Sequence, residues 1–423
     1  MKDIKVLAIA ANPFSDINNN GKTLKSIFCT FDKNSLFELY FRPQDNVIGD
    51  GEFAQSYYAI SELDIIRSFI HFNRKCGGVQ VFEREKNKEI SEDQTYKRFL
   101  HGNLKDNRFL RSLLWKSRRW DTKEFREWYQ NCNPDVVFAL LGGPSQMFTI
   151  AEEISEKLNI PLAVYFTDDY LIHPSSGKKI SKKSERAFRK IISHSSACYC
   201  IGEQMCEEYG RFFNTDFRPI MNSTDVIPYS PREDLNRPLI ISYFGGLSLG
   251  RWEMISRLAD VVKDDAVIKV YTAHEITDEI TAAFDKPNIQ MCGTVLGKDL
   301  DDARQSCDCL LHVESDKDEY RSRTALSIST KIPESLMQSR LLLAYGPSEV
   351  ASMQLIQRHN LGLFISSEQT IEAQRELFLQ YYKNPEKTRE VVKNAYDYAC
   401  THFNKQAVSE KLKRELTDLV NKQ

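Results

Sequence analysis

Long apolar runs are missing from this 423-residue sequence. No stretch comes near the ~20 apolar residues that a membrane-spanning helix requires. The apolar residues 4–10 are too few for the core of a secretory signal, and they run into Asn12 and Pro13 instead of a small-residue cleavage site. We therefore interpret residues 4–10 as a first buried strand and expect a cytoplasmic protein.

Several functional signatures are missing as well. The ten cysteines include no C-x-x-C pair and lack the spacing and nearby histidines of a zinc site, so we interpret them as reduced core residues and expect no metal. The dinucleotide fingerprint G-x-G-x-x-G is absent, which argues against a dehydrogenase. A net charge of −2 gives no reason to expect nucleic acid as a partner, and the chain has no low-complexity segment.

What the sequence does contain is an alternation of short apolar runs with longer amphipathic stretches. Helices are predicted in most of the intervals between strands, including one at 58–70. Strands are predicted at 4–10, 36–41, 135–141, 161–166, 197–201, 239–244, 267–272, 288–292, 308–313, 341–345 and 361–365. This pattern is typical of an α/β protein whose parallel sheets are covered on both faces.

The least structured connection, residues 219–238, divides the chain into two comparable α/β halves. We predict one Rossmann-like domain at 1–222, a second at 223–402, and a C-terminal helix at 403–423 that packs back on the first domain. Open parallel sheets bind ligands beyond the carboxyl ends of their strands, so functional motifs are expected directly after strands.

Residues 326–334, followed by the apolar run 341–345, are the most informative part of the chain. Pro333 lacks an N–H and suits the first turn of a helix, so a helix is predicted to begin near Ser329 or Thr330, which are both good N-cap types. The free N–H groups and positive dipole end beside Lys331 would bind an anion such as a diphosphate. The alternative is an ordinary helix cap without a ligand.

Two glycine-containing turns also follow predicted strands. In the first, Asn20 and Gly21 lie between strand 4–10 and a helix, where glycine allows backbone to approach a ligand. In the second, Gly245 and Gly246 expose backbone N–H groups, and Arg251 can hold a phosphate with its bidentate fork. Plain tight turns remain the alternative for both.

A third cluster follows the strand at 161–166. Asp169 and His173 lie at the carboxyl end of that strand, where they could orient a hydroxyl group or accept its proton. An N-capping aspartate with a surface histidine is the alternative. A further short turn, residues 291–295, would expose the backbone at Val295 to a base edge.

Taken together, these motifs resemble the retaining GT-B glycosyltransferases with an E-x7-E motif, particularly members acting on bacterial surface polysaccharides. The likeness spans most of the chain. It implies two Rossmann-like domains that face each other across a cleft, and a nucleotide-sugar donor linked to UDP or GDP. The resemblance assigns the leaving diphosphate to Arg251 and Lys331, aided by backbone N–H groups of Ser329 and Thr330. It assigns the ribose to Glu334, the base to backbone at Val295, and closure over the donor to Asn20 and Gly21.

This chain departs from the family pattern at two positions. The family's loop arginine is Gly246 here, so one phosphate contact is missing or comes from elsewhere. The first motif glutamate, which lies on the sugar side, is Leu326 here. Candidates to replace that glutamate come from the charged loop before it, namely Glu319, Arg321 and Arg323.

A basic segment, residues 97–126, carries ten lysines or arginines against three acidic residues. Trp115 and Trp120 are interleaved with leucines, so residues 109–120 are predicted as a basic amphipathic helix. Such a helix could lie on an anionic membrane and would suit a lipid-linked acceptor. The alternative is a surface helix whose apolar stripe packs inward.

The sequence thus predicts a glycosyltransferase (a hexosyltransferase) that needs no cofactor or metal and acts on a saccharide or lipid-linked acceptor, with retention inferred from the resemblance alone. It would be cytoplasmic, with peripheral contact at the inner face of the membrane. A nucleotide-sugar epimerase of the same fold, or a non-catalytic nucleotide-sugar-binding relative, stays open as an alternative.

Overall fold

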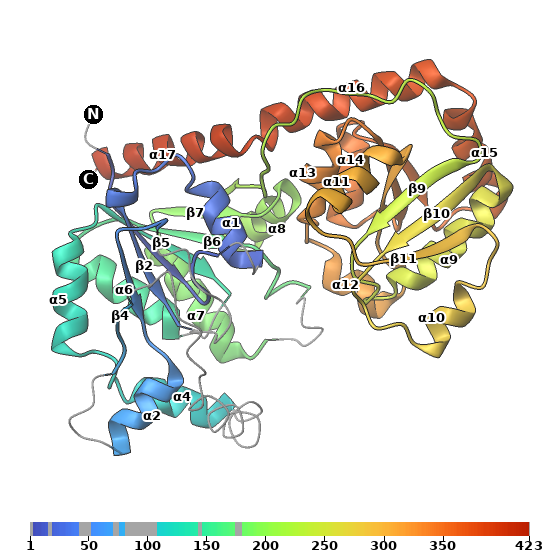
Figure 1. Ribbon diagram of the computed structural model, residues 1–423. Coiled ribbons are helices and arrows are strands. Elements are labelled where there is room, and N and C mark those ends of the chain that lie inside the picture. The colour runs from blue at the N-terminus through green and yellow to red at the C-terminus, as the bar shows by residue number, and fades with distance from the viewer. Residues whose placement is uncertain are drawn as a thin grey trace. The chain divides into compact units, whose positions relative to one another are not determined.

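The computed structural model describes residues 3–15, 19–41, 52–70, 76–80, 108–142, 146–173 and 180–422 (Figure 1). The chain forms two compact units. Unit 1 comprises Met1–Thr167, Ile180–Ile220 and Val408–Gln423, and unit 2 comprises Asp168–Lys179 and Met221–Ala407. Each unit contains one sheet with helices packed on it, so the α/β fold class predicted from the sequence is confirmed.

The sheet of unit 1 has eight strands in the order β4-β3-β2-β1-β5-β6-β7-β8. Its strands are β1 (Val6–Ala10), β2 (Leu36–Tyr40), β3 (Ser56–Ala59), β4 (Gly78–Gln80), β5 (Val136–Leu141), β6 (Leu162–Phe166), β7 (Ala197–Cys200) and β8 (Phe217–Pro219). All neighbours pair in parallel except β3 and β4. Every residue of β1, β5 and β6 is buried, as expected for a parallel sheet that is covered on both faces.

Helices cover this sheet, and the C-terminal helix is one of them. The Ser409 hydroxyl in α17 accepts from the backbone N–H of Thr30 and hydrogen-bonds the Thr30 hydroxyl, and Lys413 pairs with Asp3 at 2.5 Å. The helical elements of unit 1 are α1 (Asn19–Ile27), η1 (Lys33–Ser35), α2 (Glu62–Ile70), α4 (Arg108–Lys116), α5 (Lys123–Cys132), α6 (Gln146–Leu158), α7 (Lys182–His194), α8 (Glu203–Phe213) and, from Val408 onward, α17 (Lys405–Asn421).

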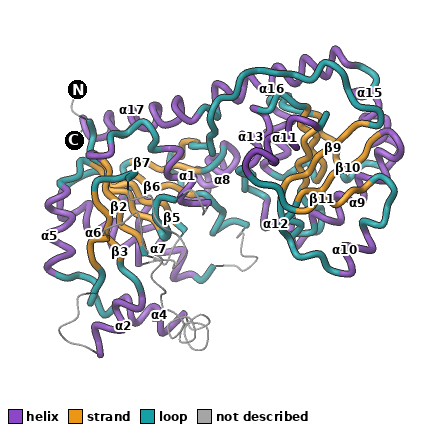
Figure 2. Tube along the Cα trace, in the orientation of Figure 1, coloured by secondary structure: helices purple, strands orange, loops and turns teal. Residues whose placement is uncertain are grey.

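The sheet of unit 2 has six parallel strands in the order β11-β10-β9-β12-β13-β14. Figure 2 shows β9, β10 and β11 side by side in this sheet. Its strands are β9 (Leu239–Phe244), β10 (Ala266–Tyr271), β11 (Ile289–Gly293), β12 (Cys309–Val313), β13 (Leu341–Gly346) and β14 (Leu363–Ser366). Its helical elements are α9 (Arg251–Val262), η3 (Lys263–Asp265), α10 (Asp278–Ala283), α11 (Gly297–Ser306), α12 (Asp318–Thr324), α13 (Lys331–Met337), α14 (Ala351–Arg358), α15 (Ile371–Tyr382) and α16 (Pro385–His402).

Strand β13, which pairs with β12 and β14, shows how both faces of this sheet are buried. Leu341, Leu343 and Tyr345 belong to one apolar cluster, whereas Leu342 and Ala344 belong to the other. Side chains of a strand alternate between the two faces of its sheet. Since both faces are buried, polar groups of this sheet are expected in the loops that follow the carboxyl ends of its strands.

One predicted element was wrong at its start. Residues 58–70 were expected to be helical, but Tyr58 and Ala59 belong to β3, which pairs in parallel with β2. The tyrosine ring is fully buried and packs against Phe125 and Trp128, with ring centroids 5.1 and 5.0 Å away. Tertiary packing of this ring outweighs the helical periodicity of the following residues, and the helix begins only at Glu62.

The described part of the basic segment begins at Arg108, so residues 97–107 lie outside the described residues. Helix α4 ends at Lys116, four residues before the predicted end. Trp115 and Trp120 are buried, and their indole N–H groups donate to Glu62 at 3.1 Å and to the carbonyl of Trp115 at 3.0 Å. These two rings therefore pack inward, and the proposed membrane contact of this segment stays a prediction.

Glu38, in the middle of β2, is fully buried, and we expect it to make stability pH-dependent. Burial raises the pKa of this carboxyl well above its usual range, although the amide of Phe14 donates to it at 2.8 Å and opposes the rise. The folded protein then holds a proton that the unfolded chain releases above about pH 4.3, so this contribution to stability is lost as pH rises.

The comparison with Glu38→Gln measures this contribution. Between that point and the raised pKa of Glu38 in the fold, the unfolding free energy of the parent relative to the variant should fall by about 1.4 kcal/mol per pH unit. Urea denaturation from pH 5 to 8 measures it, and parallel pH profiles for the two proteins would show that Glu38 is ionised in the fold.

Candidate functional site

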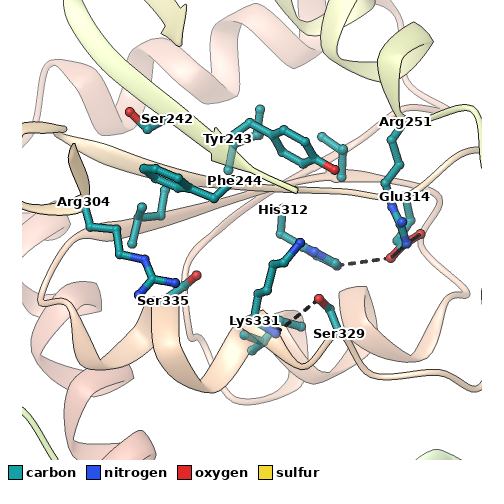
Figure 3. A pocket seen from close by; sticks show the side chains of 14 residues that line it. Ser242, Tyr243, Phe244, Arg251, Arg304, His312, Glu314, Ser329, Lys331 and Ser335 are labelled. Atoms are coloured by element: carbon teal, nitrogen blue, oxygen red, sulfur yellow. Dashed lines mark hydrogen bonds and ion pairs between the residues drawn. The ribbon is translucent and has the colours of Figure 1, made fainter. Parts of the chain in front are cut away.

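A pocket with an empty volume of about 580 Å³, including space open to solvent, lies in unit 2 (Figure 3). It forms at the carboxyl ends of β9 and β12, where α9 and α13 begin. Five of its 14 lining residues are arginine, histidine, glutamate or lysine: Arg251, Arg304, His312, Glu314 and Lys331. We call it the cationic pocket.

Lys331 lines this pocket, and Gly245, which directly follows β9, lies beside its side chain. The Lys331 ammonium lies 2.5 Å from the point that a Cβ on Gly245 would occupy. Lys331 is exposed to solvent, but its ammonium sits in the concavity, where partial desolvation and then repulsion by Arg251 lower its pKa. Among the described residues this ammonium has no hydrogen-bond or ion-pair partner, which leaves it available to an anion.

A methyl group at position 245 should therefore weaken anion binding without unfolding the protein. In Gly245→Ala the new Cβ displaces the flexible end of Lys331, so we expect nucleoside-diphosphate affinity to fall about tenfold, the loss of one charge-assisted hydrogen bond. Gly246→Ala is the matched control, because the nearest atom to its Cβ is the Ser248 hydroxyl at 3.9 Å. Calorimetric titration compares them, and equal affinities would contradict this account.

Arg251 is the first residue of α9 and lines the pocket. Its Nη2 donates to both carboxylate oxygens of Glu314, at 3.0 and 3.1 Å. Nε and Nη1 of Arg251 make no hydrogen bond within the described residues, so one side of the guanidinium stays open to a phosphate. The sequence analysis missed Glu314, although it directly follows a buried strand and was therefore detectable.

His312 lies on β12, Glu314 directly follows this strand, and both residues are buried. Burial raises the pKa of Glu314, while Arg251 opposes this shift. Burial, followed by repulsion from Arg251 and Lys331, lowers the pKa of His312 to about 3. His312 is therefore neutral at physiological pH, and its Nε2 lies 2.9 Å from the Ser352 hydroxyl and 3.9 Å from Glu314.

Arg304, from α11, is a second cation that the sequence analysis missed. It pairs with Glu334 at 2.5 Å and lies 5.9 Å from the centroid of the Phe244 ring. Phe244 in turn stacks on Tyr271, with centroids 4.7 Å apart. Glu334, the predicted ribose ligand, is thus held beside the pocket by Arg304 but does not itself line the pocket.

The start of α13 differs in detail from the prediction. Thr330 precedes the first helical residue, yet its side chain makes no capping bond. The hydroxyl of Ser329 instead accepts from the backbone N–H of Lys331 at 3.4 Å. Pro333 falls in the first turn, as its missing N–H requires. Ser329 lines the pocket and Thr330 does not.

Asp169 and His173 do not line the cationic pocket. The buried carboxylate of Asp169 accepts backbone N–H groups of Leu171, Ile172 and His173 at 2.8, 3.0 and 2.5 Å. These bonds hold a tight turn, and residues 170–173 that follow Asp169 are not helical. His173 is exposed, so its part in proton transfer stays a prediction.

The remaining predicted donor ligands also lie outside the pocket lining. Asn20 and Gly21 belong to the first turn of α1 in unit 1. A Cβ on Gly21 would come within 2.6 Å of the Pro13 carbonyl, so packing inside unit 1 already explains this glycine. Val295 follows β11 and is half-buried. Their roles in donor binding stay predictions.

The two departures from the family pattern have clear structural settings. Leu326 is only 2% exposed, so this position contributes no polar group to the pocket. Gly246 is exposed, and its carbonyl accepts the hydroxyl of Tyr243 at 2.6 Å. The proposed substitutes Glu319, Arg321 and Arg323 lie on α12 and do not line the pocket. Arg321 pairs instead with Asp318 and Glu349.

Within the described ranges, no group of three or more histidine, cysteine, aspartate or glutamate side chains is placed to hold a metal ion. None of the described helices is both long and apolar enough to cross a bilayer.

No protein-family model matches this chain, and no curated protein sequence matches it. Solved structures do. HepE from Anabaena, in complex with UDP, is similar with a TM-score of 0.65 and 12% identity over 98% of this chain and all of that chain. A glycosyltransferase from Rickettsia africae gives a TM-score of 0.64 and 9% identity over the full length of both chains. TarM from S. aureus gives 0.59 and 12% identity over 99% of this chain and all of that chain.

The chain has the GT-B fold. At such low identity the likeness establishes the fold alone. The predicted two-sheet α/β architecture is therefore confirmed, while membership of the retaining E-x7-E subgroup and the cleft between the two domains stay predictions.

Proposed function

We propose that this chain is a glycosyltransferase that moves a sugar from a nucleoside-diphosphate sugar to a saccharide or lipid-linked acceptor, with retention of configuration. The observation that carries the proposal is the cationic pocket, in which Lys331 and one side of Arg251 are open to an anion at the carboxyl edge of a parallel sheet. Structures with the same fold support the nature of the anion, since HepE was crystallised with UDP and with UDP-glucose, and TarM with UDP and a glycosylated glycerol.

The chemistry that this pocket supplies is stabilisation of a leaving group. When the bond between sugar and diphosphate breaks, negative charge develops on the departing diphosphate. Cations already in place stabilise that charge more in the transition state than in the ground state. Lys331 and Arg251 supply these cations in our proposal. Glu334, which pairs with Arg304, accepts hydrogen bonds from the ribose hydroxyl groups. A divalent metal is not part of the proposed mechanism.

The acceptor side of the proposal is assigned to the loop of Asp169 and His173. Because three backbone N–H groups occupy the Asp169 carboxylate, we assign this residue to shaping the loop. His173 is exposed and is the group we assign to the acceptor hydroxyl. Peripheral membrane contact through the basic segment remains part of the proposal for a lipid-linked acceptor.

A binding and turnover screen tests the function. Calorimetry with UDP, GDP, ADP and pyrophosphate, followed by nucleotide release from UDP- and GDP-sugars with saccharide acceptors, should show binding of at least one nucleotide and acceptor-dependent release. A rearranged donor sugar without acceptor would identify an epimerase instead. Binding without any turnover would identify a non-catalytic relative, and no nucleotide binding at all would refute the proposal.

A further inference from the structure

One carboxylate lies among the cations of the pocket, and its presence needs an explanation. Glu314 is the only acidic residue among the 14 that line it, and its side chain is 5% exposed. A buried carboxylate is costly to keep and repels a diphosphate nearby. If the pocket bound only a diphosphate, this residue would oppose its function.

Holding Arg251 in place is one possible reason for the carboxylate, but it does not use the whole group. Both contacts come from the single nitrogen Nη2 of Arg251, and His312 is 3.9 Å away and neutral. An ionised carboxylate offers about four lone-pair directions. Lone pairs therefore remain on Glu314 that could accept further hydrogen bonds.

The pocket is also chemically divided along its length. Figure 3 shows Arg304 and Phe244 at one end, Lys331 in the middle, and Arg251 with Glu314 at the other end. Charge favours a diphosphate near Lys331 and the open side of Arg251. A neutral group rich in hydroxyl donors is what suits the end at Glu314, because hydroxyl groups donate to a carboxylate and do not repel it.

The position that the sequence pattern reserves for a sugar-side glutamate cannot do this. Leu326 is apolar and buried, and the charged residues of α12 do not line the pocket. We propose that Glu314 recognises the transferred sugar of the donor by accepting hydrogen bonds from its hydroxyl groups, while Arg251 holds the carboxylate in place. This inference rests on the proposed function and assigns a specificity-determining residue to its donor site.

The substitution Glu314→Gln separates the sugar from the nucleotide. The sugar increment is defined here as the ratio of affinities of a nucleotide sugar and its parent nucleotide. Calorimetry measures it for UDP-glucose, UDP-N-acetylglucosamine and UDP-galactose against UDP, and for GDP-mannose against GDP. In the parent protein, the best of these sugars should bind tighter than its nucleotide. In Glu314→Gln the increment should fall about tenfold or more, while the nucleotide binds equally well or tighter, because one negative charge is gone.

Two further variants keep the test decisive. Glu314→Asp retains the charge but retracts it by one methylene, and it should also lose the sugar increment. This variant replaces Glu314→Gln in the test if thermal melting shows that Glu314→Gln is unfolded. Glu349→Gln is the matched control, because Glu349 is a half-exposed carboxylate of the same unit that pairs with Arg321, and this variant should keep the increment.

The opposing outcomes are distinct. An unchanged increment in both Glu314 variants, or equal loss of nucleotide and nucleotide-sugar affinity, would overturn the inference and leave Glu314 as a support for Arg251 alone. A parent protein that binds nucleotides without any sugar increment would also overturn it while sparing the proposed function. Failure to bind any nucleotide would refute the proposed function itself.

Discussion

Lys331→Ala is expected to lower the turnover of the donor by about 10²–10³-fold, the effect of removing one preorganised group that stabilises developing negative charge. Nucleoside-diphosphate affinity should fall less, by about tenfold, because the ammonium matters most as the diphosphate departs. The ammonium has no hydrogen-bond or ion-pair partner among the described residues, so its removal breaks no such interaction and should leave the melting temperature nearly unchanged. Calorimetry with UDP and steady-state kinetics measure the two effects.

Lys317→Ala is the matched control for this experiment. Lys317 lies in the same unit and its ammonium pairs with Glu253 at 2.6 Å, outside the cationic pocket. Its removal should change neither binding nor turnover. Equal kinetic losses in both variants would indicate a general charge effect, and an unchanged Lys331→Ala enzyme would remove this residue from the mechanism.

Arg251→Ala should combine the loss of donor binding with a large loss of stability. Glu314 would remain buried without its partner, and breaking a buried ion pair in this way costs about 3–5 kcal/mol. Its pKa, already raised by burial, would rise further once Arg251 no longer opposes the shift. When the pKa of a carboxyl is raised in the fold, the unfolding free energy falls as pH rises above the pKa of that carboxyl in the unfolded chain. The variant should therefore be less stable relative to the parent at pH 8 than at pH 5.

The double variant Arg251→Ala with Glu314→Gln separates the two effects. Removing the unpaired charge should restore most of the unfolding free energy, measured by urea denaturation, but should not restore nucleotide affinity. If the double variant stays as unstable as Arg251→Ala, the loss comes from packing around the guanidinium. If it recovers affinity, Arg251 does not contact the diphosphate.

Particular residues show why much of the fold and part of the site could be predicted from the sequence. The prediction for β9, residues 239–244, coincides with the observed strand because apolar runs bounded by glycine are a strong local signal. Gly245, Arg251 and Lys331 come together because they follow strands or begin helices, and the edge of a parallel sheet gathers such positions.

Other features depend on contacts that no local pattern contains. Arg304 reaches the pocket from a helix whose orientation the sequence does not reveal, and Tyr58 joins β3 through packing with distant aromatic rings. Asp169 shows that a local pattern can also mislead. Its side chain accepts hydrogen bonds from neighbouring backbone N–H groups, yet in the sequence the same residues resemble a catalytic motif. Glu314 was detectable, because it directly follows the predicted strand 308–313.

The central claim is that the cationic pocket of unit 2 holds the diphosphate of a nucleotide sugar. A crystal structure of the protein with UDP tests it most directly. We expect diphosphate oxygens within hydrogen-bond distance of both the Lys331 ammonium and the Arg251 guanidinium. A diphosphate bound elsewhere, with Lys331 and Arg251 contacting only protein and water, would contradict the account.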